Sequence, residues 1–135
     1  MSDAVNDTVN DAVNDTVVTL VVNGHEAQVR ADHPHLLSAL REELDVTSPK
    51  DGCSPSGQCG CCTVLIDGKA VVACQMSLTR AAGKSIVTLE GVSDEERECY
   101  SSAFAAVGGL QCGFCIPGIV IRAKEIGRAS CRERV

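Results

Sequence analysis

The chain has 135 residues, 44% of them apolar but only 2% aromatic, and a formal charge of −6 at pH 7. Its Lys and Arg are scattered, which argues against a nucleic-acid or anionic-membrane surface. No apolar run reaches the ~18 residues that span a bilayer, and the acidic start lacks the regions of a signal peptide. We therefore expect a soluble, cytoplasmic chain with no nucleic-acid and no membrane partner.

Residues 1–16 are predicted to form a disordered acidic tail. From Ser2 the sequence repeats with a period of four, and every copy carries an Asp and no basic residue. A period of four could indicate a helix. However, Asn, Asp, Thr and Val are mediocre helix formers, and the uncompensated Asp side chains repel one another.

Two β-hairpins are predicted where strand-like runs flank a two-residue turn signal. Asn-Gly and Asp-Gly are strong signals because both residues tolerate positive φ. The first hairpin pairs 17–22 with 26–30 around Asn23-Gly24, and the second pairs 63–66 with 69–73 around Asp67-Gly68. Residues 85–89 form a further candidate strand.

One amphipathic helix is predicted between the hairpins. Asp32 can cap it, Pro34 falls in its first turn, and it ends near Val46. Its apolar face, expected to pack on the sheet, consists of Leu36, Leu37, Leu40 and Leu44. Hairpin, helix, hairpin and late strand together indicate an α+β fold.

Beyond residue 91 the pattern becomes helical. Ser93 and Glu96 form a capping box that predicts a helix over 94–107, ended by Gly108-Gly109. Pro117 starts a second helix that runs over 118–125. Cys99 is expected to be a core residue of the first of these helices.

The last ten residues, 126–135, read like a translated short-read sequencing adapter. We expect that they carry no biological information and that the natural sequence is cut at about Glu125; an ordinary basic helix end is the alternative. The predicted domains are thus the tail 1–16, a first domain 17–90, a helical region 91–125 and the adapter-like end 126–135.

The strongest functional signal is the cysteine spacing C-x5-C-x2-C-x11-C, formed by Cys53, Cys59, Cys62 and Cys74. A 2Fe-2S cluster takes four thiolates around two irons, and plant-type ferredoxins supply three from a C-x4-C-x2-C loop and a fourth from further along. The loop here is one residue longer. Its glycines allow backbone N–H groups to point at sulfur: Gly52, Gly57 and Gly60.

Two ambiguities concern the ligands. Cys61 competes with Cys62, but the two-residue gap after Cys59 favours Cys62, so we expect Cys61 to be a small buried thiol. A zinc site is the rival to iron and sulfur, because C-x2-C pairs also make zinc knuckles. That site would use Cys59, Cys62, Cys112 and Cys115 and would leave Cys53 and Cys74 unexplained.

Longer motifs make the chain resemble a known family, the iron–sulfur subunits of the xanthine dehydrogenase and aldehyde oxidoreductase group of molybdenum hydroxylases. The resemblance covers Val18 to about Glu125. The motifs that carry it are Asn23-Gly24, the leucine-rich stretch 36–44, Lys50-Asp51-Gly52-Cys53, Cys59-Gly60-Cys61-Cys62-Thr63-Val64-Leu65-Ile66-Asp67-Gly68 and Gln111-Cys112-Gly113-Phe114-Cys115-Ile116-Pro117-Gly118.

The resemblance implies a β-grasp ferredoxin-like domain followed by an α-helical bundle domain, each holding one 2Fe-2S cluster. The first would use the four loop and hairpin cysteines. Cys112 and Cys115 would give the second cluster two ligands, with the other two from a later C-x-C pair that this chain lacks. Gln111 matches a glutamine beside the molybdopterin.

The implied function is electron transfer, with no catalytic site on this chain. Electrons from a large molybdopterin-binding subunit would reach FAD on a medium subunit by way of the 2Fe-2S clusters. A stand-alone 2Fe-2S ferredoxin and a zinc-binding structural or interaction module are the alternatives. Two residues depart from the family pattern: Cys61, where many members have Ala, and Ile116, where a small hydroxyl residue is usual.

Overall fold

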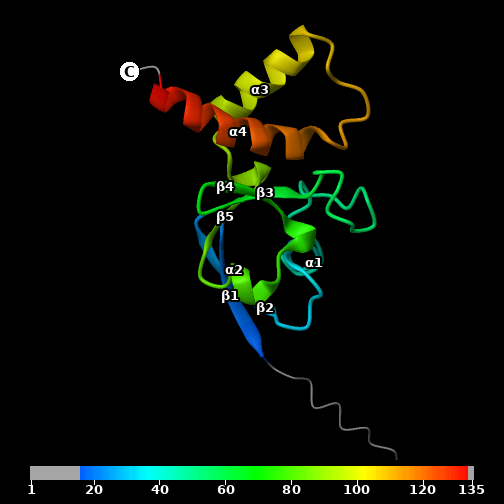
Figure 1. Cartoon of the computed structure of the whole chain (residues 1–135), viewed down its shortest axis with the longest axis vertical. Helices are drawn as coiled ribbons and strands as arrows, with labels where there is room; N and C mark the ends of the chain where they lie inside the picture. Colours follow the sequence, from blue (N-terminus) through cyan, green and yellow to red (C-terminus); the bar gives the residue numbers. More distant parts are fainter. Residues whose placement is uncertain (1–15, 134–135) are drawn as a thin grey trace, which may run out of the picture.

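The computed structural model describes the backbone of residues 16–133 and the side chains of 16–127 (Figure 1). The predicted acidic tail, apart from Thr16, lies outside the described residues. None of the described helices combines the length and the apolar character that crossing a bilayer demands.

A five-stranded mixed sheet organises the chain in the order β2-β1-β5-β3-β4. β1 and β5 are parallel, and the other neighbours are antiparallel. Both hairpins are confirmed, because Asn23-Gly24 and Asp67-Gly68 all have the positive φ of primed turns. The strands are β1 (Val17–Val22), β2 (His25–Arg30), β3 (Thr63–Ile66), β4 (Lys69–Val72) and β5 (Ser85–Val87).

The main core lies between the sheet and two short helical segments. One is α1 (Leu36–Ser38), which continues as the π-helical turn η1 (Ala39–Glu43), and the other is α2 (Leu78–Ala81). The predicted leucine face is confirmed: its first three leucines are at most 2% exposed, and Leu44 packs on them at the edge. The α+β fold class is therefore correct.

The predicted start of the leucine-rich helix is wrong. The helix begins at Leu36, and its cap is His35, whose Nδ1 accepts a hydrogen bond from the Ser38 N–H at 3.1 Å. Asp32 lies 3.7 Å from the Arg30 guanidinium instead. Pro34 consequently precedes the helix rather than lying in its first turn.

Two strands are shorter than predicted, because 3-10 turns take over at their ends. β4 ends at Val72 and is followed by η2 (Ala73–Gln75), and β5 ends at Val87, shortly before η3 (Leu89–Gly91). Cys74 therefore lies in a tight turn and is 5% exposed.

Two longer helices, α3 (Asp94–Ala106) and α4 (Ile116–Glu133), gather on the β3–β4 side of the sheet (Figure 1). The Ser93 cap is confirmed, since its Oγ accepts the Glu96 N–H at 3.3 Å. No residue of α3 is buried, so the prediction that Cys99 is a core residue is wrong. α4 packs through Ile121 on Leu65 and Val92, and it continues across residue 126 without a break.

Candidate metal centre

The cysteine loop joins η1 to β3 and is closed at its base by backbone hydrogen bonds. The Lys50 N–H donates to the Cys61 carbonyl at 2.9 Å, and Thr63 donates its N–H and its hydroxyl to the Gly60 carbonyl at 3.1 and 2.7 Å. Positive φ values at Ser54, Gly57 and Gly60 let the chain curl between these anchors. The loop thus turns its cysteines toward one another.

Cys53 lies in a ring of hydrogen-bond donors. The Ser56 hydroxyl and the backbone N–H groups of Cys59, Ser56 and Gln58 lower the pKa of the Cys53 thiol to about 6. The Ser56 N–H lies 3.2 Å from the Cys53 sulfur. Such donors favour negative charge on sulfur, which is the form that binds iron.

Cys62 and Cys74 form a buried pair across the β3–β4 hairpin. They are 2% and 5% exposed, and the Ala73 N–H donates to the Cys62 carbonyl at 3.2 Å. Burial raises the pKa of the Cys62 thiol, and the Cys74 sulfur lies within hydrogen-bonding reach of the Cys62 sulfur. Cys62 and Cys74 are thus buried from solvent, whereas Cys53 is partly exposed.

Cys59 and Cys61 lie next to each other in the loop. Cys59 is exposed, and its sulfur accepts the Cys61 N–H at 3.4 Å. Cys61 is 7% exposed, which confirms that it is a buried small thiol, and burial raises its pKa. Its neighbours include the thiols of Cys59, Cys53 and Cys115.

The number and chemistry of the thiols in this region fit a two-iron cluster. Among the described residues, no three His, Cys, Asp or Glu side chains converge closely enough to hold a metal ion, so the distances favour neither zinc nor a cluster. Cys62 lies beside Cys74, the Cys59 backbone N–H points at the Cys53 sulfur, and the Cys59 sulfur lies next to Cys61. A 2Fe-2S cluster takes two thiolates on each iron, so this donor set fits it.

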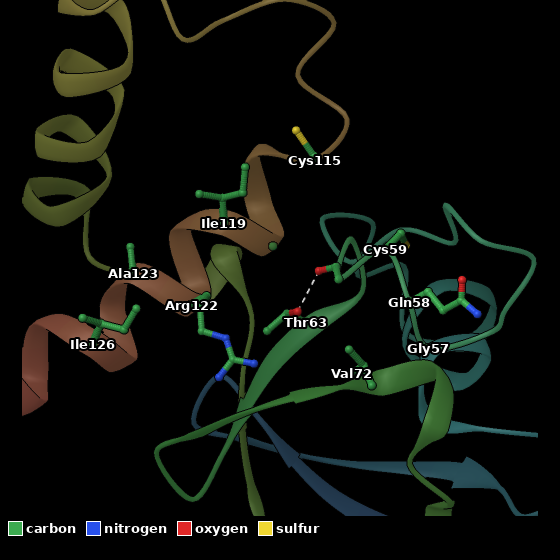
Figure 2. Close-up of a pocket in the computed structure, with 12 residues that line it drawn as sticks. Gly57, Gln58, Cys59, Thr63, Val72, Cys115, Ile119, Arg122, Ala123 and Ile126 are labelled. Atoms are coloured by element: carbon green, nitrogen blue, oxygen red, sulfur yellow. Dashed lines mark hydrogen bonds between the residues drawn. The ribbon is translucent and has the colours of Figure 1, made fainter.

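The second group of predicted site residues lies between α3 and α4. Gln111, Cys112 and Cys115 are all exposed. Cys115 lines a cavity of about 510 Å³ that Cys59 lines from the opposite side. Figure 2 shows this cavity between α4 and the end of the cysteine loop. The structure therefore places Cys115 beside the cysteine loop.

One contact at this site was missed by sequence reasoning. A Cβ on Gly118, in the first turn of α4, would lie 2.3 Å from the Gly60 carbonyl oxygen. The available signal was the glycine itself, because glycine is a poor helix former and its presence in a helix calls for a packing reason.

Comparison with known proteins agrees with this geometry. The family described as a 2Fe-2S binding domain matches residues 88–134. The nicotinate dehydrogenase small FeS subunit of Eubacterium barkeri is 37% identical over 111 residues, which cover 81% of this chain and 70% of that protein. The chain belongs to the family of small 2Fe-2S subunits of the xanthine dehydrogenase and aldehyde oxidoreductase type.

Other members of the family support the same alignment. The xanthine dehydrogenase iron-sulfur-binding subunit of Escherichia coli O157:H7 is 39% identical over 105 residues, 77% of this chain and 65% of that protein. Quinoline 2-oxidoreductase from Pseudomonas putida 86 superposes with a TM-score of 0.73 at 37% identity, over 82% of this chain and 69% of that one. The chain thus spans about two thirds of the length of these relatives.

Proposed function

We propose that Cys53, Cys59, Cys62 and Cys74 hold a 2Fe-2S cluster and that the chain is an electron-transfer subunit of a molybdenum hydroxylase. The observation that carries this proposal is the ring of N–H donors around the Cys53 sulfur together with the buried pair Cys62 and Cys74. When bound, such a cluster accepts and returns one electron at a time. Any bond chemistry belongs to a cofactor on a partner.

The chain's own residues divide the work at this site. The N–H groups around Cys53 stabilise negative charge on its sulfur, and the buried pair Cys62 and Cys74 keeps water from the inner half. The exposed Cys59 leaves one edge of the site near the surface. That edge is where an electron can enter or leave over a short distance.

The partners we propose are a large molybdopterin-binding subunit and a medium FAD-binding subunit. The names of the relatives differ in the compound oxidised, nicotinate in one and quinoline in another, while this chain resembles both at 37% identity. Substrate choice is therefore assigned to the large partner. We further propose that Cys112 and Cys115 are half of a second cluster site and that the exposed Gln111 faces the molybdopterin.

The predicted domain organisation stays part of this proposal. Residues 17–90 form the cluster-holding domain, and 91–125 form the first part of the helical domain. α4 runs through most of residues 126–135 without a break. The proposal that this segment is adapter-encoded therefore rests on its sequence alone.

A stand-alone 2Fe-2S ferredoxin is the second candidate, because the loop and hairpin could serve alone. The match of residues 88–134 to a second 2Fe-2S binding domain favours a subunit over a simple ferredoxin. A zinc-binding module is the third, and visible absorption separates it from an iron–sulfur protein.

Anaerobic reconstitution with iron and sulfide tests the proposal. We expect a red-brown protein whose visible absorption bleaches on reduction, with two irons and two sulfides in the first site. Pull-down with the chains encoded beside it should recover a molybdopterin-binding partner. Colourless protein with one zinc per chain would reject the iron–sulfur proposal, and a coloured protein that binds neither subunit would favour the stand-alone ferredoxin.

A further inference from the structure

The first turn of α4 lies directly against the cysteine loop. A Cβ on Gly118 would stand 2.3 Å from the carbonyl oxygen of Gly60 and 3.3 Å from the Cα of Cys61. Both are backbone atoms, which cannot rotate away as the end of a side chain could. At this separation, only a residue without a Cβ can occupy position 118.

Neither side of this contact is free to retreat. The Gly60 carbonyl is held by both hydrogen bonds from Thr63. On the other side, α4 is fixed to the sheet by Ile121, which is 1% exposed, and by Glu125, whose carboxylate accepts the Ala70 N–H at 3.0 Å. A side chain at 118 must therefore push α4 and the loop apart.

A second contact joins the same two segments at the start of the loop. A Cβ on Gly52 would lie 3.1 Å from Cε1 of Phe114 and 3.0 Å from the sulfur of Cys59. The Lys50 ammonium lies 5.7 Å from the centre of the Phe114 ring, within cation–π range. Residues 114–118 thus contact the loop at two points, one on each side of Cys59.

We propose that residues 114–118 form a cover over the cysteine loop and that Gly118 is the positioning residue that sets how closely the cover fits. A tight cover limits solvent access to the part of the loop around Cys61, which is 7% exposed, while the Cys59 edge stays open, since the shell around a metal site controls solvent access. This inference rests on the proposed 2Fe-2S site. It assigns α4 a role at the first site, besides any part it takes in a second.

The test compares two glycines of the same helix in the full chain. Gly118→Ala adds a methyl group against the loop, whereas a Cβ at Gly127 would meet nothing within 4 Å, which makes Gly127→Ala the matched control. After reconstitution, the loss of visible absorption to an iron chelator is timed. The reduced protein is then exchanged into deuterated water, and deuterium coupling to the paramagnetic centre is measured by spin-echo spectroscopy.

For Gly118→Ala we expect cluster loss that is severalfold faster and a larger deuterium signal, and for Gly127→Ala neither change. The deuterium signal separates a cover from a merely stabilising contact, because it reports water beside the cluster in folded protein. Equal loss rates and equal signals in Gly118→Ala and the unsubstituted chain would overturn the inference.

A variant that adds no atoms covers the case in which Gly118→Ala fails to assemble. Phe114→Ala removes the second contact, and it should also speed cluster loss and raise the deuterium signal. Unchanged values in Phe114→Ala would then overturn the inference. If the unsubstituted chain itself forms no 2Fe-2S cluster, the proposed function fails, which is a distinct result.

Discussion

The sheet region and the α3–α4 region use cysteine in opposite surroundings. In the sheet region, Cys62 and Cys74 are nearly inaccessible and Cys53 is ringed by N–H groups. In the α3–α4 region, Cys112 and Cys115 are exposed, and α3 buries no residue. The comparison teaches that the sheet provides shielding that α3 and α4 do not: two of the four predicted ligands are buried in the first region, and both predicted ligands are exposed in the second.

The largest expected effect comes from removing a ligand of the first site. Replacing any one of Cys53, Cys59, Cys62 and Cys74 by Ser should abolish or destabilise the cluster and lower the unfolding midpoint, because a metal bound only by the folded state contributes to folding. Iron content and thermal unfolding measure both effects.

The matched control for these variants is Cys61→Ser, which should keep its iron. Cys112→Ser should also leave the first site intact, since this exposed residue belongs to the other region. Loss of iron in Cys61→Ser, together with its retention in Cys62→Ser, would show that the two neighbouring cysteines have exchanged roles.

Core substitutions have the next largest expected effect and compare the stability of the sheet region with that of the α3–α4 region. Leu40→Ala in the main core should cost ~2–5 kcal/mol of unfolding free energy and weaken the cluster with the fold. Ile121→Ala, in the small cluster under α4, should loosen α4 while the sheet stays folded. Hydrogen exchange resolved by residue distinguishes the two outcomes, and equal loss of protection throughout both variants would mean that the regions unfold as one unit.

A carboxylate near the boundary makes the sheet region sensitive to acid. Burial works to raise the pKa of Glu90, but hydrogen bonds from Ser48 and Thr88 outweigh it and hold the pKa below its usual range. A lowered folded-state pKa stabilises the fold at neutral pH, and this contribution is lost as the pH falls through the unfolded and then the folded value. Glu90→Gln should therefore lower the unfolding midpoint at pH 7 and have less effect near pH 4. A pH-independent difference would contradict this account.

The smallest expected effect concerns the tie between α3 and α4. The Lys124 ammonium lies 2.6 Å from the Glu96 carboxylate, and this pair is partly exposed, so Lys124→Ala should cost at most ~1 kcal/mol. Faster hydrogen exchange in α3 with an unchanged sheet is the expected result. Arg97→Ala breaks a pair within α3 only and serves as the control.

Local chemistry made much of this fold predictable. The two turn signals fixed both hairpins, and the leucine spacing identified the buried helix face, because each depends on neighbours in sequence. The helix cap was missed because a histidine ring nitrogen took the place expected for Asp32. Cys99 was misplaced because its helix buries no residue, which the pattern of the helix alone does not show.

The site shows the same division between features that follow from neighbours in sequence and features that follow from packing. The cysteine spacing alone led to the predicted ligand set, and the structure places Cys62 beside Cys74 and points N–H groups at Cys53. The approach of α4 to Gly60 depends on how two distant segments dock, so no local pattern could identify the partner of Gly118. A glycine inside a helix start was the one residue that indicated such a contact.

Counting iron, sulfide and paramagnetic signals in the reconstituted monomer tests the central claim most directly. The account predicts two irons and two sulfides per chain and one signal on reduction, because the sheet region holds the four predicted ligands of the first cluster, whereas only Cys112 and Cys115 are predicted ligands of the second. Four irons with two distinct signals would contradict the contrast between the regions. One zinc with no visible colour would contradict the iron–sulfur site itself.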